Sequence, residues 1–81
     1  VLIRHLRPPD KQRTGWTYRC EQRGVTLENT GNVRAEFTDV SWGGGRRQDS
    51  LSVYPGTPLH FDDARMTLSM EGKAQVLECP Q

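Results

Sequence analysis

The sequence predicts an all-β protein, a small antiparallel β-sandwich of about seven strands. Apolar and polar residues alternate along most of the chain, and no segment longer than a turn or two shows helical spacing. Turn-forming Gly, Pro, Asn and Asp residues recur about every 8 to 12 residues, as in sandwiches. At 81 residues the chain has room for one domain with a small core.

The first residues are predicted to form an extended segment that ends at consecutive prolines. Residues 1–6 are expected to be extended, and the run Arg7-Pro8-Pro9-Asp10 is expected to end this segment, because adjacent prolines cannot continue a hydrogen-bonded ladder. Residues 11–14 are a polar linker. The sandwich domain is therefore expected to span residues 11–81, with its first strand after residue 14.

A β-hairpin is expected next. Trp16, Tyr18 and Cys20 lie two apart, a turn follows at residues 22–24, and alternation resumes with Val25.

A change of phase marks the following strand. Ala35 and Phe37 share one face, whereas Val40 and Trp42 fall on the opposite parity. One extra residue near Asp39, a β-bulge, would bring both pairs to the same core.

The remaining strands are short and bounded by turns. Residues 29–32 (Asn-Thr-Gly-Asn) are the clearest turn, because Asn and Gly tolerate the positive φ of tight reversals. Residues 43–47, three glycines and two arginines, are expected to be a loop. Further short strands are expected at residues 51–53, 59–61, 66–70 and 74–79. Most of the core is expected from Trp16, Tyr18, Leu27, Phe37, Leu51, Val53, Phe61, Leu68 and Val76.

Composition excludes several classes of protein. Apolar residues make up 33% and charged residues 26%, which indicates neither a disordered chain nor a membrane-spanning one. The net charge of +1 gives no strong attraction to nucleic acid or anionic lipid. We expect no nucleic-acid partner and no membrane insertion.

The two cysteines, Cys20 and Cys79, are too far apart in sequence for a zinc motif. A disulfide in an oxidising compartment is the favoured interpretation. Two buried free thiols are the alternative, because cysteine is often a core residue.

No pattern typical of catalysis or metal binding is present. His5 and His60 have no ligand-spaced partners. Asp62 and Asp63 are adjacent, so on a strand they would point to opposite faces, and a solvated turn is preferred. The glycine-arginine run at residues 43–47 lacks the remainder of a phosphate-binding loop. We expect no catalytic, metal or cofactor residue, and a binding or assembly module rather than an enzyme.

Three segments in order resemble the second domain of periplasmic pilus-assembly chaperones of the chaperone–usher pathway. Residues 1–8 (Val-Leu-Ile-Arg-His-Leu-Arg-Pro) are similar to the end of that family's inter-domain strand. Residues 24–37 are similar to its first strands around an Asn-x-Gly/Pro turn. Residues 53–61 are similar to the proline-glycine segment that follows.

The resemblance implies an immunoglobulin-like sandwich in the periplasm. Residues 1–10 would be the end of the inter-domain strand and a linker, with Val1, Ile3, Arg4 and Arg7 on the strand that meets the partner, and residues 11–81 would be the sandwich. The parent chaperone would bind pilin subunits by β-augmentation and deliver them to an outer-membrane usher.

The family's subunit-anchoring basic residues match no position of this chain, and its cysteines match no general family feature. This segment alone is therefore not expected to complete a subunit. A free-standing extracellular binding or adhesion module is the alternative.

Overall fold

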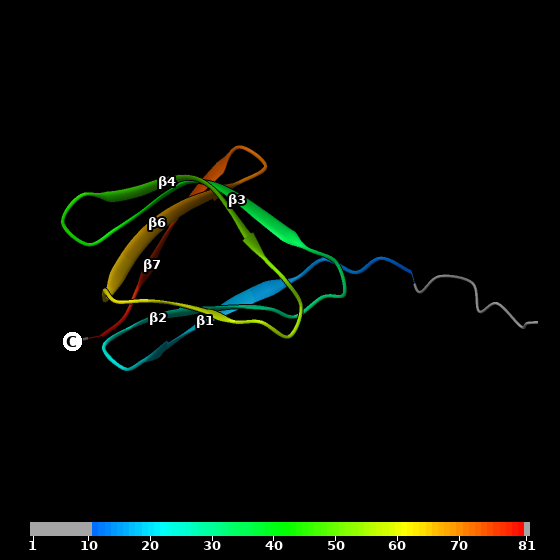
Figure 1. Cartoon of the computed structure of the whole chain (residues 1–81), viewed down its shortest axis with the longest axis horizontal. Helices are drawn as coiled ribbons and strands as arrows, with labels where there is room; N and C mark the ends of the chain where they lie inside the picture. The colour runs from blue at the N-terminus through cyan, green and yellow to red at the C-terminus, as the bar shows by residue number, and fades with distance from the viewer. Residues whose placement is uncertain (1–10, 81) are drawn as a thin grey trace, which may run out of the picture.

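The computed structural model describes residues 11–80, which form seven strands and no helix (Figure 1). The strands are β1 (Trp16–Glu21), β2 (Gly24–Asn29), β3 (Ala35–Trp42), β4 (Arg46–Val53), β5 (Leu59–Phe61), β6 (Arg65–Met70) and β7 (Lys73–Glu78). All strand pairs within the sheets are antiparallel. The predicted all-β class is confirmed.

The strands form two sheets, consistent with a β-sandwich. One sheet has the order β1-β2-β5 and the other β4-β3-β6-β7. Figure 1 shows β1 and β2 as one layer, and β3, β4 and β6 as the other. The chain passes between the sheets after β2, after β4 and after β5, so connections as well as the core tie the layers together.

The core lies between the sheets. Eleven apolar residues are buried there: Val25, Leu27, Ala35, Phe37, Val40, Leu51, Val53, Phe61, Met66, Leu68 and Leu77. Six of the nine predicted core residues are among them, and Trp16 packs against the cluster from its margin. The Trp16 ring meets the Phe37 ring edge to face, with ring centroids 5.1 Å apart.

Two core predictions, Tyr18 and Val76, are wrong. Val76 is 49% exposed because β7 runs in the other phase, which turns Leu77 inward and Val76 outward. Tyr18 is 37% exposed although it lies opposite the buried Leu27. Its strand, β1, is a sheet edge, so few atoms cover it on the open side.

The predicted bulge in β3 is confirmed. The register between β3 and β6 shifts between Thr38 and Ser41, and Asp39 between them has a φ of 51°. Phe37 and Val40 are consequently both buried, each with 1% of its surface exposed. The extra residue thus returns the second half of β3 to the core.

Strand β4 begins earlier than predicted, at Arg46 rather than Leu51. Its first half pairs with β3 from Trp42 opposite Arg46, and the loop shrinks to residues 43–45. The first five residues of β4 are exposed on both faces of the sheet, so apolar alternation does not mark them as a strand. Backbone pairing with β3, and not burial, keeps them in the sheet.

Cys20 and Cys79 form a disulfide, and neither is a free thiol. The bond joins β1, at the edge of the three-stranded sheet, to the residue that follows β7, at the edge of the other sheet. It is compatible with an oxidising, exported location. No helix among the described residues could cross a membrane.

Replacing Phe37 with Ala is expected to lower the free energy of unfolding by about 3 kcal/mol, because a fully buried ring leaves a cavity. Urea unfolding followed by tryptophan fluorescence measures this. The exposed Val76→Ala variant is the control, with an expected loss below about 0.5 kcal/mol. A loss below about 1 kcal/mol for Phe37→Ala would show that the core is misplaced.

Removing the disulfide with the Cys20→Ser/Cys79→Ser double variant is expected to lower the free energy of unfolding by about 4 kcal/mol. The bond joins residues whose sequence separation is 59, and closing so long a loop restricts the unfolded chain. Urea unfolding of the variant and of the oxidised chain gives the difference. Equal midpoints for the two would contradict this expectation.

Candidate functional site

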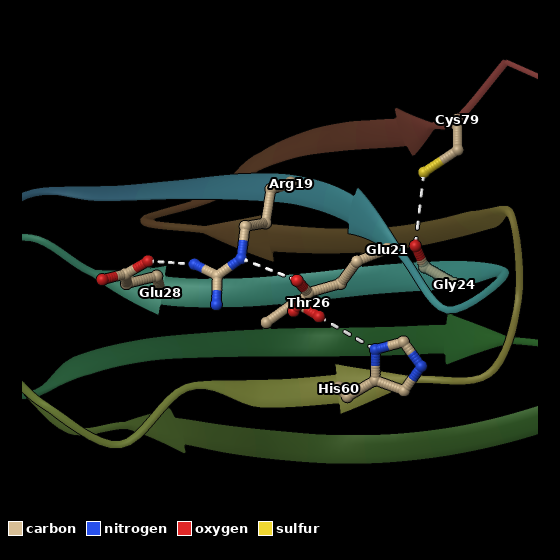
Figure 2. A network of polar contacts seen from close by, with 7 residues as sticks. All are labelled: Arg19, Glu21, Gly24, Thr26, Glu28, His60 and Cys79. Carbon is tan, nitrogen blue, oxygen red and sulfur yellow. Dashed lines mark hydrogen bonds and ion pairs between the residues drawn. The ribbon is translucent and has the colours of Figure 1, made fainter.

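The outward face of the three-stranded sheet carries a connected set of polar side chains. Arg19 of β1, Thr26 of β2 and His60 of β5 lie side by side in the strand register. Because side chains alternate across a sheet, their apolar neighbours face the core while these three face outward. Together with Glu21 and Glu28 they form the polar face (Figure 2).

Charge pairs and one buried hydroxyl hold the polar face together. Arg19 forms ion pairs with Glu28 and with Glu21, the latter at 3.2 Å between Nε and Oε2. Thr26 Oγ1 and His60 Nδ1 are 2.9 Å apart and hydrogen-bonded. Thr26 is only 3% exposed, so the surrounding side chains cover its hydroxyl.

These contacts shift the pKa of two groups. The hydrogen bond from Arg19 lowers the pKa of Glu21, and the hydroxyl of Thr26 lowers it further. The hydrogen bond to Glu21 raises the pKa of Arg19. Arg19 is thus paired with both glutamates of the polar face, and Thr26 links this face to β5 through His60.

Gly24 lets β5 lie close to the start of β2. A Cβ at this position would lie 2.1 Å from the Phe61 carbonyl oxygen and within 3 Å of the His60 ring. Any side chain there would displace β5 and separate His60 from Thr26.

The second polar element is a turn organised by Asn29, which is 6% exposed. Its Nδ2 donates to the carbonyl oxygens of Val33 at 2.7 Å and Val53 at 2.9 Å, and its Oδ1 accepts from the Gly31 N–H at 2.8 Å. Asn29 also forms a bridge with Pro55, which follows β4. Through its side chain and its backbone, this one residue therefore joins the end of β2 to the turn, to the end of β4 and to the β4–β5 connection.

The turn at residues 29–32 was predicted for the wrong reason. None of its residues has a positive φ. Asn29 acts through its side chain, and Gly31 is required by space, since a Cβ there would lie 2.2 Å from the Arg13 carbonyl oxygen. Asn followed two residues later by Gly is the signal of such a side-chain turn.

Asn32 binds the segment that enters the sandwich. Its Oδ1 accepts from the Arg13 N–H at 2.8 Å, its Nδ2 donates to the Lys11 carbonyl at 3.1 Å, and its own N–H donates to the Arg13 carbonyl at 3.0 Å. Thr30 N–H donates to the Gly15 carbonyl at 3.0 Å. Residues 11–15 are thereby held along the turn.

Two hollows open on the surface, and neither was predicted. One, of about 590 Å³, lies between the start of β3 and the β6–β7 turn and includes Trp16, Ala35 and Met70. The other, of about 560 Å³, lies beside the disulfide, at Cys20 and Cys79. Both depend on side chains that the fold assembles from distant strands, so no local pattern indicates them.

The residues singled out in the sequence are only partly brought together. Cys20 and Cys79 are bonded. His60 lies 3.6 Å from Asp62, measured from Nε2 to Oδ1, while Asp63 Oδ1 instead accepts from the Arg65 N–H. No group of three or more metal-binding side chains occurs within residues 11–80.

The residues expected on the inter-domain strand lie outside the described part of the chain, as does His5; they are Val1, Ile3, Arg4 and Arg7. Comparisons of the chain with protein-family models, curated proteins and solved structures find no match.

Replacing Arg19 with Met is expected to return the pKa of Glu21 towards the ordinary glutamate value, because the main cause of its lowering is removed. An NMR titration of the Glu21 carboxyl carbon measures this. Since the folded-state pKa is lowered, the stabilisation by this carboxylate is present above the ordinary value and is lost as pH falls through the lowered one.

Arg65→Met is the matched control for that titration, because Arg65 pairs with Glu78 instead. An unchanged Glu21 pKa in Arg19→Met, or an equal change in both variants, would contradict the described network.

Replacing Asn29 with Ala is expected to lower the free energy of unfolding by about 2 kcal/mol, because it leaves the Val33 and Val53 carbonyls without their donor. Asn29→Asp keeps the acceptor but sets a carboxylate against those carbonyls. It should be more destabilising at pH 7 and recover on acidification as the carboxylate is protonated. Chemical unfolding at both pH values tests the pair, and a cost below about 0.5 kcal/mol for both would exclude this role.

Proposed function

We propose that this chain is the second domain of a periplasmic chaperone that binds pilin subunits and delivers them to an outer-membrane usher, without catalysis. The observation that carries the proposal is that two segments with the family resemblance meet at Asn29. The segment of residues 24–37 contains Asn29, and the segment of residues 53–61 supplies the Val53 carbonyl and Pro55 that Asn29 contacts.

This contact supports the proposal because it gives the two motifs a joint structural role. The first segment comprises β2, the turn and the start of β3, and the second carries the chain from β4 to β5. Separate turns could each arise by chance in any β protein. Two segments that contact each other must keep a fixed order and spacing. Their joint occurrence therefore supports the family resemblance more strongly than either motif alone.

The domain's contribution would be structural. The parent would lend a strand to an incomplete pilin sandwich, with backbone hydrogen bonds giving affinity and alternating side chains filling pockets. This domain would form the second wall of the subunit cleft and support the strand that runs between the domains. The oxidising periplasm suits the disulfide. No cofactor is required.

The test is the parent reading frame upstream of Val1, followed by binding measurements. We expect a preceding β domain that ends in an apolar strand with a basic residue. Co-expressed in a bacterial periplasm, the parent should co-purify with pilin subunits encoded beside its gene, whereas residues 1–81 alone should not.

Two results would overturn the proposal. A secretion signal directly before Val1 would favour a free-standing extracellular adhesion module. Undiminished pilin binding by residues 1–81 would refute the assignment of subunit binding to the upstream part.

A further inference from the structure

The start of β3 has a strand neighbour on one side only. Ala35 and Glu36 pair with Val53 and Ser52 of β4. On the opposite side the ladder with β6 begins only at Thr38, because the β6–β7 hairpin turns back after Met70. No strand among residues 11–80 therefore pairs with Ala35 or Glu36 on that side.

This free stretch of edge presents hydrogen-bonding groups. Successive residues of a strand direct their backbone N–H and C=O to opposite edges. Of Ala35 and Glu36, one must therefore face the open side rather than β4. No backbone hydrogen bond outside the strand ladders occupies these groups within the described part of the chain. An unpaired edge of this kind is a template for another extended segment.

The larger hollow lies at the same place. It includes Ala35 and Glu36 of the free edge and continues over Trp16 and Met70. Trp16 and Met70 are only partly buried, and both pack against the core cluster. An apolar side chain entering here would cover both of them and extend the core outward.

The charges at the rim favour a basic ligand. The Arg34 guanidinium is already paired, because its NH2 lies 3.1 Å from Glu36 Oε1. A hydrogen bond with Tyr54 raises the pKa of Arg34. Glu71, also at the rim, has no ion pair among the described residues. One carboxylate therefore remains to attract a cation.

We propose that this hollow binds an extended segment of a partner polypeptide, which adds to β3 beyond the end of β6. The segment's backbone would bond to the free edge, one apolar side chain would rest against Trp16 and Met70, and a neighbouring basic side chain would pair with Glu71. Main-chain bonds combined with a side-chain pocket are the features of β-augmentation. This site is independent of the proposed function, because it uses only the described strands of this chain.

The free edge is short, so a pentapeptide is an adequate probe. We expect a dissociation constant on the order of 1 mM for so small an interface. The probe is acetyl-Thr-Lys-Leu-Lys-Thr-amide. One control carries Glu in place of both Lys residues, and a second carries N-methyl groups on all three central residues, so that none of them can donate to the β3 edge.

The experiment is an NMR titration of the oxidised, nitrogen-15-labelled 81-residue chain. The basic probe is expected to give saturable shifts of the Ala35 and Glu36 amides and of the Trp16 indole N–H. The acidic and N-methylated probes are expected to give little shift. Glu71→Lys should weaken binding about fivefold, as expected for exchanging an exposed attraction for a repulsion.

Asp49→Lys is the matched control variant, because it makes the same charge change on β4, outside the hollow. It should bind the basic probe as the unaltered chain does. Both substitutions are at exposed positions, so both variants should fold.

Several outcomes would overturn the proposal. These are the absence of saturable shifts at about ten times the expected dissociation constant, equal binding of the N-methylated probe, and equal weakening by Glu71→Lys and Asp49→Lys. Much tighter probe binding by a variant lacking residues 1–6 would assign the hollow to the chain's own N-terminal segment and would equally overturn it.

Discussion

The arrangement of the two sheets depends on the side-chain amide of Asn29. It stands at the end of β2 in one sheet and donates to the last residue of β4, Val53, in the other. The same nitrogen closes the turn that leads into β3, and the residue bridges to Pro55 where the chain returns to the first sheet. Apolar burial brings the sheets together but has no direction. The hydrogen bonds of Asn29 supply direction, and they fix how two successive crossings between the sheets are placed.

Much of the fold follows from local patterns in the sequence. The change of parity between Phe37 and Val40 was sufficient to locate the bulge at Asp39, because a buried strand cannot otherwise keep both side chains inside. Tyr18 and Val76 were misassigned because alternation gives the two faces of a strand but does not say which is covered or where a sheet ends. Those facts depend on neighbours that are remote in sequence.

The candidate sites were less predictable than the fold for the same reason. His60 gains its role from Thr26 and from the missing side chain of Gly24, both more than thirty residues away. The free edge of β3 exists only because β6 ends at Met70. Asn29 was recognised as a turn residue, but its contact with Val53 depends on the packing of two sheets. Sequence patterns indicate which residues are polar and exposed, and tertiary structure decides which of them meet.

The position of the disulfide also determines how the domain would respond to tension. A pulling force applied on either side of the cross-link would pass along β1 to Cys20 and leave through Cys79, which follows the last strand. The two cysteines are separated by 59 positions in the sequence, so 58 residues lie between them. These residues would lie inside the loop that the disulfide closes and would bear no load. Only the first four residues of β1 could detach from the sheet before the disulfide carried the force. Oxidation thus makes most of the sandwich mechanically inextensible, whatever its thermodynamic stability.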